Sequence, residues 1–354
     1  MRFPEFTEEW VNVSLKDVAD FQKERISSGL LDESTYISTE NILQNFQGVQ
    51  SAISIPANTN VVAYKKNDIL LSNIRPYLKK AWFSDRIGGC SADVFVLRSK
   101  TCEPEFLYNV IASDKFINYV MSGAKGVKMP RGDKNQMESF SFSIPAVVEQ
   151  RKISRLFQLL DERIVTQNKI IEKLQSLIKG ITILLTAKGK PNTTIAQCLE
   201  CHSSTLQESE VSHSGLYKVF GANGLVGYTD MPQMNGDAIL IIKDGSGVGT
   251  TSYAQGEFSV IGTLNYLTAI SNYDLRYLYF VLSVFNFQSY KTGMAIPHIY
   301  FKDYGNAKIF CPPLSEQKRI ANVLGKLESK LCLEQNILAS FNLQKRYLLG
   351  QMFI

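Results

Sequence analysis

The stretch Ile144-Pro-Ala-Val-Val-Glu-Gln-Arg-Lys-Ile153 returns 167 residues later as Cys311-Pro-Pro-Leu-Ser-Glu-Gln-Lys-Arg-Ile320. Proline, glutamate, glutamine and isoleucine recur at matching positions, and the two basic residues exchange their order. The same offset relates residues 126–130 (Gly-Val-Lys-Met-Pro) to residues 293–297 (Gly-Met-Ala-Ile-Pro). Two matches at one offset indicate a tandem duplication. The chain therefore contains one unit twice, and each unit is a globular region followed by a helix.

Each copy of the repeated stretch predicts the start of a long helix. A proline in the entering turn favours initiation, and a glutamate in the first turn interacts well with the helix dipole. Apolar residues then follow at spacings of three and four, which is the heptad pattern of a coiled coil. The predicted seam residues are Phe157, Leu160, Ile164, Gln167, Ile171 and Leu174 in the first helix, and Leu324, Leu327, Leu331, Glu334, Leu338 and Phe341 in the second.

The two seams carry their polar interruption at the same place, Gln167 and Glu334. Because both seams belong to one chain and have similar lengths, we predict that they pair with each other as an antiparallel coiled coil. Alternatively, each helix packs on its own globular region, or the helices pair between chains. A helix of ~40 residues is ~60 Å long. The stretch Lys188-Gly-Lys-Pro191 supplies the glycine and proline that end the first helix.

These signals divide the 354 residues into a globular region at 1–147, a helix at 148–190, a second globular region at 191–313 and a second helix at 314–354. Each globular region mixes short runs typical of strands, such as 69–71 and 239–242, with one helical stretch, at 104–121 and 275–290. This mixture predicts an α+β domain with a curved sheet. The predicted fold class is α+β, with two pseudo-repeated globular α/β domains separated by two long helices that form an antiparallel coiled coil.

The composition is typical of a soluble globular protein, with 45% hydrophobic and 20% charged residues. No apolar run approaches the ~18 uncharged residues of a membrane span, and the first residues do not resemble a signal peptide. We therefore expect a cytoplasmic protein without membrane association. The six cysteines are scattered through the chain, and we expect them to be reduced thiols.

The net charge of +5 says little about nucleic acid, because the excess lies on the helical segments. Segment 148–190 carries nine basic and four acidic side chains, whereas segment 191–313 carries six and nine. Residues 65–100 are locally basic, with eight Lys or Arg against three Asp. Any DNA contact is thus expected at local stretches.

Two motifs suggest other chemistry. Cys198-Leu-Glu-Cys201-His202 matches the pattern for covalent haem attachment or half of a zinc site. Haem attachment requires export and zinc requires a second ligand pair, so we interpret the motif as small residues that open a domain. The stretch Asp244-Gly-Ser-Gly-Val-Gly-Thr-Thr251 lacks the Gly-Lys-Ser/Thr ending of a phosphate-binding loop. A tight loop close to DNA and a plain hairpin both fit it.

With three histidines in the chain, no Ser-His-Asp arrangement is evident, and no carboxylates have metal-ligand spacing. We expect no catalytic site, metal or cofactor in this chain. Cations combined with polar and aromatic side chains near strand ends are what phosphate and base-edge contacts require. The candidate DNA-binding residues are Lys65, Lys66, Ser72, Asn73, Arg75, Lys79, Lys80, Lys128, Arg131 and Lys134 in the first globular region, and Lys218, Asn223, Lys243, Thr250, Thr251, Tyr253, His298, Tyr300 and Lys302 in the second.

The duplicated Pro-x-x-x-Glu-Gln-(Arg/Lys)-(Lys/Arg)-Ile helix start, at Pro145 and Pro312, resembles the specificity subunits of type I restriction-modification systems. The resemblance covers the whole chain, and a departure is Ala146, where the second copy has Pro313. It implies that the globular regions are target recognition domains, each reading half of a split double-stranded DNA site. It also implies that the helices are the spacer and that the chain is non-catalytic. Two methyltransferase subunits, which use S-adenosylmethionine, and two restriction or translocase subunits would be its partners.

Other functions fit the same sequence. The first is a coiled-coil scaffold whose globular regions bind protein. The second is a stand-alone enzyme with a site that the sequence does not reveal. The third is a specificity subunit that serves a methylation-only or type II-like system. Retardation of a DNA duplex by the chain with its partner would favour the DNA-reading function over the scaffold.

Overall fold

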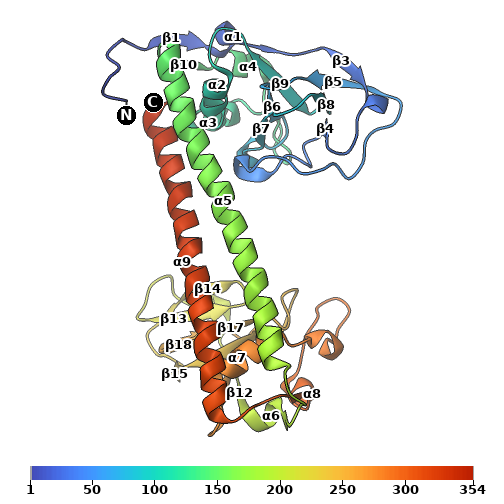
Figure 1. The fold of residues 1–354 in the computed structure, drawn as a ribbon, viewed down its shortest axis with the longest axis vertical. Coiled ribbons are helices and arrows are strands. Elements are labelled where there is room, and N and C mark those ends of the chain that lie inside the picture. Colours follow the sequence, from blue (N-terminus) through green and yellow to red (C-terminus); the bar gives the residue numbers. More distant parts are fainter. Residues whose placement is uncertain (1, 354) are drawn as a thin grey trace. The chain divides into compact units, whose positions relative to one another are not determined.

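The computed structural model describes residues 2–353. Its contacts divide the chain into two compact units: unit 1 is Met1–Asn168 with Ile337–Ile354, and unit 2 is Lys169–Asn336. Each unit contains one globular region and one half of each long helix (Figure 1). This grouping differs from the four sequence segments, because the two ends of each helix pack against different globular regions.

Unit 1 contains two four-stranded sheets and a strand pair. The first sheet has the order β2-β9-β6-β7, with β2 (Ala19–Phe21), β9 (Val94–Ser99), β6 (Ile69–Ser72) and β7 (Ala81–Phe83), all antiparallel. The second has the order β3-β5-β8-β4, with β3 (Arg25–Ser27), β5 (Asn60–Tyr64), β8 (Gly88–Cys90) and β4 (Tyr36–Ile37). Strands β1 (Val11–Ser14) and β10 (Ser141–Ile144) pair the two ends of the globular region. The helices are α1 (Leu15–Val18), α2 (Pro104–Ile111), α3 (Asp114–Ser122) and α4 (Lys134–Glu138), with 3-10 turns η1 (Ser28–Leu30), η2 (Gln44–Phe46) and η3 (Pro76–Leu78).

Unit 2 repeats this plan. Its first sheet has the order β12-β19-β16-β17, with β12 (Leu199–Ser203), β19 (Leu264–Ala269), β16 (Ala238–Ile242) and β17 (Thr251–Ala254). Its second has the order β14-β13-β18-β15, with β14 (Gly224–Thr229), β13 (Tyr217–Gly221), β18 (Glu257–Val260) and β15 (Met234–Asn235). The ends pair through β11 (Thr193–Thr194) and β20 (Lys308–Ile309). The helices are α6 (Ile195–Cys198), α7 (Leu275–Ser283) and α8 (Phe301–Tyr304), with turns η4 (Glu208–Glu210) and η5 (Phe287–Tyr290).

The two units differ at the edge of the second sheet. In unit 1, β8 lies between an antiparallel strand, β5, and a parallel strand, β4. In unit 2, β18 lies in the same way between β15 and β13. The fourth strand is added on opposite sides of these three: in unit 1 it is β3, next to β5, and in unit 2 it is β14, next to β13. The predicted pseudo-repeat is therefore confirmed, and the two copies differ in the edge strand of the second sheet.

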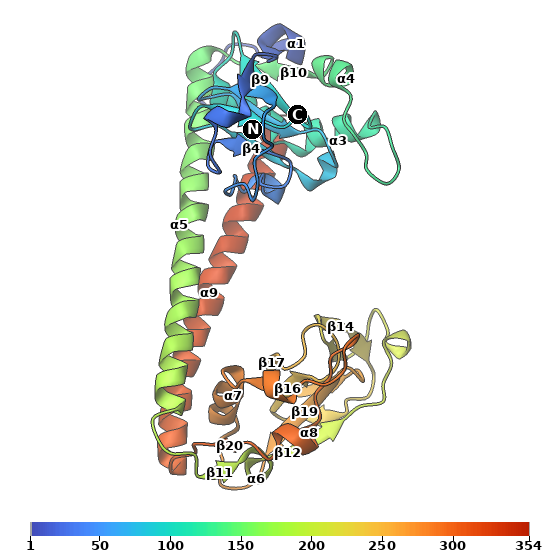
Figure 2. The same cartoon turned by 90° about the vertical axis from the view of Figure 1, so that its right-hand side faces the viewer.

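The apolar runs of the sequence are strands with two covered faces. In β6, Ile69 and Leu71 belong to the core against the helices, whereas Leu70 belongs to the core between the two sheets. In β16, Ile239 and Ile241 face the helices and Leu240 faces the other sheet. Successive side chains of a strand point to opposite faces, so a sheet buried on both faces needs an unbroken apolar run. Figure 2 shows α7 lying beside β16 and β17.

The single helical stretch predicted at 104–121 is wrong, because two helices occupy it. Helix α2 ends at Ile111, and the Ser113 hydroxyl accepts a hydrogen bond of 3.2 Å from the backbone N–H of Phe116 and caps α3. In the second unit, α7 ends at Ser283, and the side chain of Asn286 caps the separate turn η5. Serine and asparagine are strong N-cap residues. The apolar periodicity continues across both breaks, which is why the sequence hides them.

The repeated glutamine joins each long helix to its globular region. In unit 1, Gln150 accepts a 2.9 Å hydrogen bond from the backbone N–H of Glu103, the N-cap of α2, and donates one of 2.8 Å to the carbonyl of Pro145. In unit 2, Gln317 accepts from Asp274, the N-cap of α7, and donates to Pro312, both at 2.8 Å. Both glutamines are 2% exposed. The duplicated Pro-x-x-x-x-Gln spacing is thus a buried two-bond anchor.

Replacing either glutamine by alanine is expected to lower the free energy of unfolding of its unit by ~1–3 kcal/mol, because a buried N–H and a buried carbonyl lose their partners. Urea unfolding of Gln150→Ala and Gln317→Ala, followed by far-UV circular dichroism for both units and by the fluorescence of Trp10 and Trp82 for unit 1, measures this. Gln175→Ala, at an exposed position of the same helix as Gln150, is the matched control. Equal midpoints for all three variants would contradict the anchoring role.

The long helices are α5 (Val147–Thr186) and α9 (Leu314–Met352). In unit 1, the start of α5 packs against the end of α9: the ring of Phe353 lies 6.2 Å from Phe157, and Lys345 donates a 2.5 Å hydrogen bond to Asp161. In unit 2, Ile181 and Leu185 near the end of α5 pack in one core with Leu324 near the start of α9. The helices therefore run antiparallel within each unit. Every predicted seam residue is buried or half-buried.

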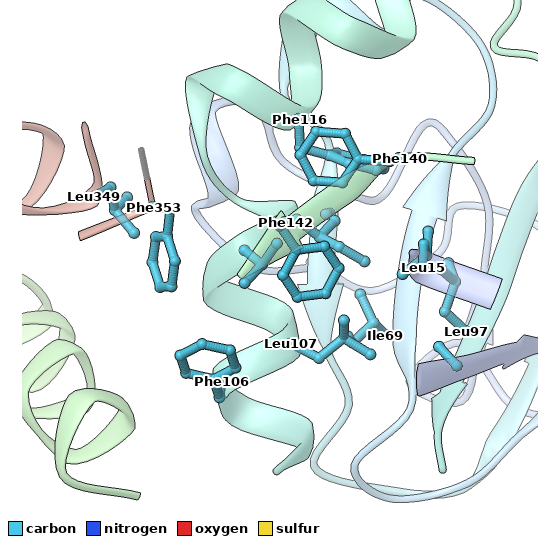
Figure 3. Packing of buried hydrophobic residues seen from close by; sticks show 14 of the residues in the cluster. Leu15, Ile69, Leu97, Phe106, Leu107, Phe116, Phe140, Phe142, Leu349 and Phe353 are labelled. Carbon is cyan, nitrogen blue, oxygen red and sulfur yellow. The ribbon is translucent and has the colours of Figure 1, made fainter. Parts of the chain in front are cut away.

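The core of unit 1 includes the end of α9. Figure 3 shows Leu349 and Phe353 directed toward Phe106, beyond which Leu107 and Ile69 continue the apolar layer. The rings of Phe106 and Phe353 lie 5.4 Å apart at 71°. The end of α9 and Phe353 thus contribute to the core around the first globular region.

Cys198 lies buried at the end of α6, with its sulfur 3.9 Å from that of Cys311. All six cysteines are free thiols. Cys198 therefore opens a domain as predicted, packed on the residue that closes it. Within residues 2–353, no helix is long and apolar enough to cross a membrane.

Candidate nucleic-acid interface

Two loops that are distant in sequence are joined in unit 1. Residues 73–75 follow strand β6, and residues 125–131 follow α3. The N–H of Arg75 donates to the carbonyl of Pro130 at 2.8 Å, and the N–H of Gly132 donates to Asn73 at 3.0 Å. Lys125 and Arg131 close the second loop with reciprocal backbone hydrogen bonds of 3.0 and 2.9 Å. The structure therefore brings together two of the stretches predicted to contact DNA.

Unit 2 forms the same pair of loops. The N–H of Gly245 donates to Pro297 at 2.9 Å, and the N–H of Ile299 donates to Lys243 at 3.0 Å. Thr292 and His298 close the second loop at 2.9 and 2.8 Å. The glycine-rich stretch 244–251 thus belongs to a loop that leads into strand β17. We name these surfaces loop pair 1 (residues 73–80 and 125–134) and loop pair 2 (residues 243–251 and 292–302).

Backbone geometry explains the repeated Gly-x-x-x-Pro. Gly126 has φ +97° and Gly293 has φ +87°, in the region that L side chains rarely adopt. A Cβ at position 293 would lie 2.4 Å from the carbonyl oxygen of Ile296. Glycine is therefore required for the tight turn that returns the chain to the proline.

Each of these turns carries two exposed aliphatic side chains that sequence reasoning missed. Val127 and Met294 are fully exposed at equivalent positions, and Met129 and Ile296 follow two residues later, 48% and 66% exposed. The signal that could have found them is the repeat itself, because apolar residues recur in a loop that has neither helix nor strand periodicity. They are positioned to touch a partner surface that is partly apolar.

The cations of loop pair 1 differ in their pairing. Arg131 pairs with Asp93 at 2.8 Å, and Lys125 pairs with Asp133 at 3.0 Å, which lowers the pKa of that carboxyl group. Lys79 pairs with Asp114, and Lys134 lies 3.4 Å from Glu138. By contrast, Arg75 and Lys128 are exposed and form no ion pair with the residues that the structure describes. These two cations are the ones free to contact a phosphate.

Some predicted residues have other roles or other places. Ser72 is buried, and its hydroxyl donates to the carbonyl of Ile74, so it shapes the loop. The ammonium of Lys80 donates to the carbonyl of Thr39 at 2.6 Å. Lys65 and Lys66 lie at the opposite end of β6 from loop pair 1, where Lys65 is 3.4 Å from Glu24. The structure thus separates these two lysines from the loops.

Loop pair 2 is poorer in cations and richer in polar groups. Lys243, Thr250 and Thr251 belong to its first loop. His298 contacts the ring of Tyr300 at 5.1 Å between centroids, and the ammonium of Lys302 lies 5.2 Å from the same ring. Lys218 and Asn223 lie on the β13–β14 hairpin.

Tyr253 lies outside this group. Its hydroxyl donates to Asp237 at 2.8 Å, and its ring packs under the guanidinium of Arg276. Burial raises the pKa of this tyrosine. Its surroundings are those of a packed side chain and differ from those of the exposed loop residues.

Known proteins share this arrangement. Residues 7–176 and 196–342 match the family model described as type I restriction modification DNA specificity domain. The chain belongs to the family of type I restriction-modification specificity subunits. Over 191 residues it is 27% identical to the MjaVIII specificity subunit of Methanocaldococcus jannaschii, and over 198 residues it is 23% identical to the EcoDI specificity subunit of Escherichia coli. These matches span 51% and 55% of this chain, but only 43% and 44% of those relatives.

Solved structures share the fold of this specificity subunit. The S subunit of the type I restriction-modification system from M. genitalium superposes with a TM-score of 0.68 at 16% identity, covering 98% of this chain and 96% of that one. A chain from a structure on complex assembly and conformational transition of the type I R-M system superposes with a TM-score of 0.59 at 17% identity, covering 97% of each chain. At such identities the likeness establishes the fold, and the DNA-contacting residues of this specificity subunit stay a prediction.

Proposed function

We propose that this chain reads a bipartite DNA site, each unit reading one half through its loop pair, as the specificity subunit of a type I restriction-modification complex. The observation that carries the proposal is the recurrence of one loop pair in both units, with the same hydrogen bonds, the same glycine turn and the same exposed apolar positions. Two equivalent readers in one chain suit a target with two halves. The two loop pairs share a backbone conformation but carry different side chains, which suits the reading of two different half-site sequences.

The two loop pairs are suited to different contacts. The free cations Arg75 and Lys128 suit phosphate contacts, whereas the threonines, His298 and Tyr300 of loop pair 2 suit hydrogen bonds to base edges. The exposed Val127 and Met294 suit apolar contacts such as the methyl group of thymine. The remaining phosphate contacts of the second half-site would come from partner subunits.

We further propose that the chain itself is non-catalytic. Its partners would be two methyltransferase subunits, which hold S-adenosylmethionine, and two restriction or translocase subunits. Methylation requires that the target base leave the helical stack. The specificity subunit would choose the base and the methyltransferase would flip and modify it.

The proposal is tested by removing the two free cations. Methylome sequencing of the source cell gives the bipartite site, and the purified complex with its methyltransferase subunits is then titrated with that duplex at several salt concentrations. For Arg75→Ala/Lys128→Ala we expect affinity to fall about tenfold or more, and the slope of log affinity against log salt to decrease by about one to two. Both changes follow from losing phosphate contacts.

A charge-matched control is Lys16→Ala/Lys23→Ala, which removes two exposed cations outside the loop pairs. This variant should bind the duplex as the wild type does. Equal affinity and equal salt slope for the two double variants would exclude loop pair 1 from the DNA interface. Failure of the wild-type complex to bind any methylated motif would exclude the proposed function altogether.

A further inference from the structure

Unit 2 contains a complete site for a guanidinium group, filled by its own arginine. The guanidinium carbon of Arg276 lies 4.3 Å from the ring centroid of Tyr253, 5.1 Å from that of Tyr279 and 5.3 Å from that of Phe280. The group forms an ion pair with Glu328 of α9, and the hydroxyl of Tyr279 donates to the same carboxylate at 2.8 Å. Aromatic faces and a carboxylate are the groups that bind a planar guanidinium best.

Unit 1 has the same framework at equivalent positions. Phe83 faces Ile69 across the β6–β7 ladder, as Tyr253 faces Ile239 across the β16–β17 ladder. The aromatic pairs match, since Phe83 lies 5.7 Å from Tyr108 and Tyr253 lies 5.5 Å from Tyr279.

The carboxylate of this framework matches as well. Asp161 follows the anchoring Gln150 in α5 by the same number of residues as Glu328 follows Gln317 in α9. Unit 1 therefore retains the two aromatic rings and the carboxylate of the site.

What differs is the occupant. Counted from the N-caps of α2 and α7, Glu105 stands where unit 2 has Arg276, and Asn109 stands where unit 2 has Phe280. Without the arginine and the phenyl ring, unit 1 has a pocket of about 620 Å³ whose lining includes Phe83, Tyr108, Asn109 and Asp161.

Two polar groups of this pocket have no side-chain partner among residues 2–353. Asn109 is 4% exposed and lines the pocket, and its side chain forms no hydrogen bond within residues 2–353. Glu105 forms no ion pair among the same residues, whereas Asp161 is paired with Lys345 and Glu162 lies 3.6 Å from Arg155. Three carboxylates against two cations leave the pocket acidic. The Asn109 amide opens onto the pocket without a hydrogen bond of its own, so it is available to a ligand bound there.

We propose that this pocket binds the side chain of an arginine that a protein partner inserts into unit 1. The guanidinium would lie on the rings of Phe83 and Tyr108, as Arg276 lies on its own aromatic residues, and donate to Glu105 and to the amide oxygen of Asn109. Arginine suits the site better than lysine, because its flat group stacks on rings and donates to two acceptors at once. The pocket exceeds one guanidinium in volume, so the backbone and neighbours of a protein segment complete its filling.

The identity of that partner as a methyltransferase subunit rests on the proposed function, whereas the preference for guanidinium does not. The experiment therefore has two arms. In the first, methylguanidinium is added to the full chain at millimolar concentration, and backbone amide shifts are followed by NMR. We expect shifts at the residues that line the pocket in α2 and α5, and their loss in Glu105→Arg, which fills the pocket from within as in unit 2. Absence of shifts in the wild type would overturn the proposal.

In the second arm, the affinity of the methyltransferase subunit for the chain is measured by calorimetry. We expect Glu105→Arg and Asn109→Phe to lower it at least tenfold, while Arg276→Ala, at the equivalent place in unit 2, leaves it unchanged. Unchanged unfolding midpoints show that the variants fold. Wild-type affinity in both pocket variants would overturn the assignment of the pocket to this partner and leave the proposed function standing. Failure of the wild type to bind the methyltransferase would count against the proposed function, and the first arm then decides the pocket alone.

Discussion

Exchanging residues 191–313 for the corresponding segment of a relative with a different target is expected to replace one half of the recognised DNA site and leave the other half unchanged. Each mismatched base pair costs ~1–3 kcal/mol in a specific complex. When the hybrid meets the original site with two or three mismatches in one half, it should therefore bind ~30-fold to ~10⁶-fold more weakly. Methylome sequencing of cells that carry the hybrid measures the change directly.

The exchange is physically reasonable because the two ends of this segment are hydrogen-bonded to each other. The side chain of Asn192 accepts from the N–H of Cys311 at 2.9 Å and donates to its carbonyl at 2.8 Å, and β11 pairs with β20 next to them. The hybrid must also keep an N-cap residue that can donate to Gln317 and a side chain that can pair with Glu328. The matched control is the reciprocal exchange of residues 1–147. A change in both half-sites after either exchange would contradict the division of reading between the units.

Inserting four residues, about one helical turn, after Asn168 of α5 is expected to lengthen the gap between the two half-sites by one or two base pairs. One turn adds about 5.4 Å, and base pairs are spaced by about 3.4 Å. This expectation follows from the spacer role that the resemblance to the family implies for the paired helices. The position is chosen because the two compact units meet there in the sequence. The methylated motif of the variant, obtained by sequencing, gives the new gap.

A four-residue insertion beside Gly256 is the control for this change. Gly256 lies in an exposed turn of unit 2 with open space around it, so the insertion leaves both long helices unaltered. The control should keep the original gap and the original half-sites. An unchanged gap in the helix variant, or a changed half-site with an unchanged gap, would contradict the role of the helices as a spacer.

The repeat explains how much of this fold could be predicted without coordinates. The strands β6 and β16 and the long helices α5 and α9 stand where the sequence predicts them, because unbroken apolar runs and heptad spacing are local signals. The break between α2 and α3 was missed because Ser113 interrupts the backbone without interrupting the apolar pattern. The division of each globular region into two sheets was not predicted, because one curved sheet was expected and the edge strands β4 and β15 contain only two residues each. Such short strands form only because neighbours supply their hydrogen bonds.

The candidate DNA surface was predicted only incompletely, for a similar reason. Stretches around Arg75 and Lys128 were selected by residue chemistry, and the structure joins them in one loop pair. The same chemistry also selected Lys65 and Tyr253, which lie elsewhere. Charge and aromatic character are properties of a residue, whereas the end of a strand at which it lies depends on the fold.

By itself, the sequence determined the duplication, the two helices with their seams and the family, because these features repeat at fixed spacing along the chain. Only the tertiary structure decided which loops meet, what the buried glutamines hold, and that a pocket filled by Arg276 in unit 2 stands open beside Glu105 in unit 1. The reason is that such features are contacts between residues far apart in sequence, and their energies depend on neighbours that no local pattern names.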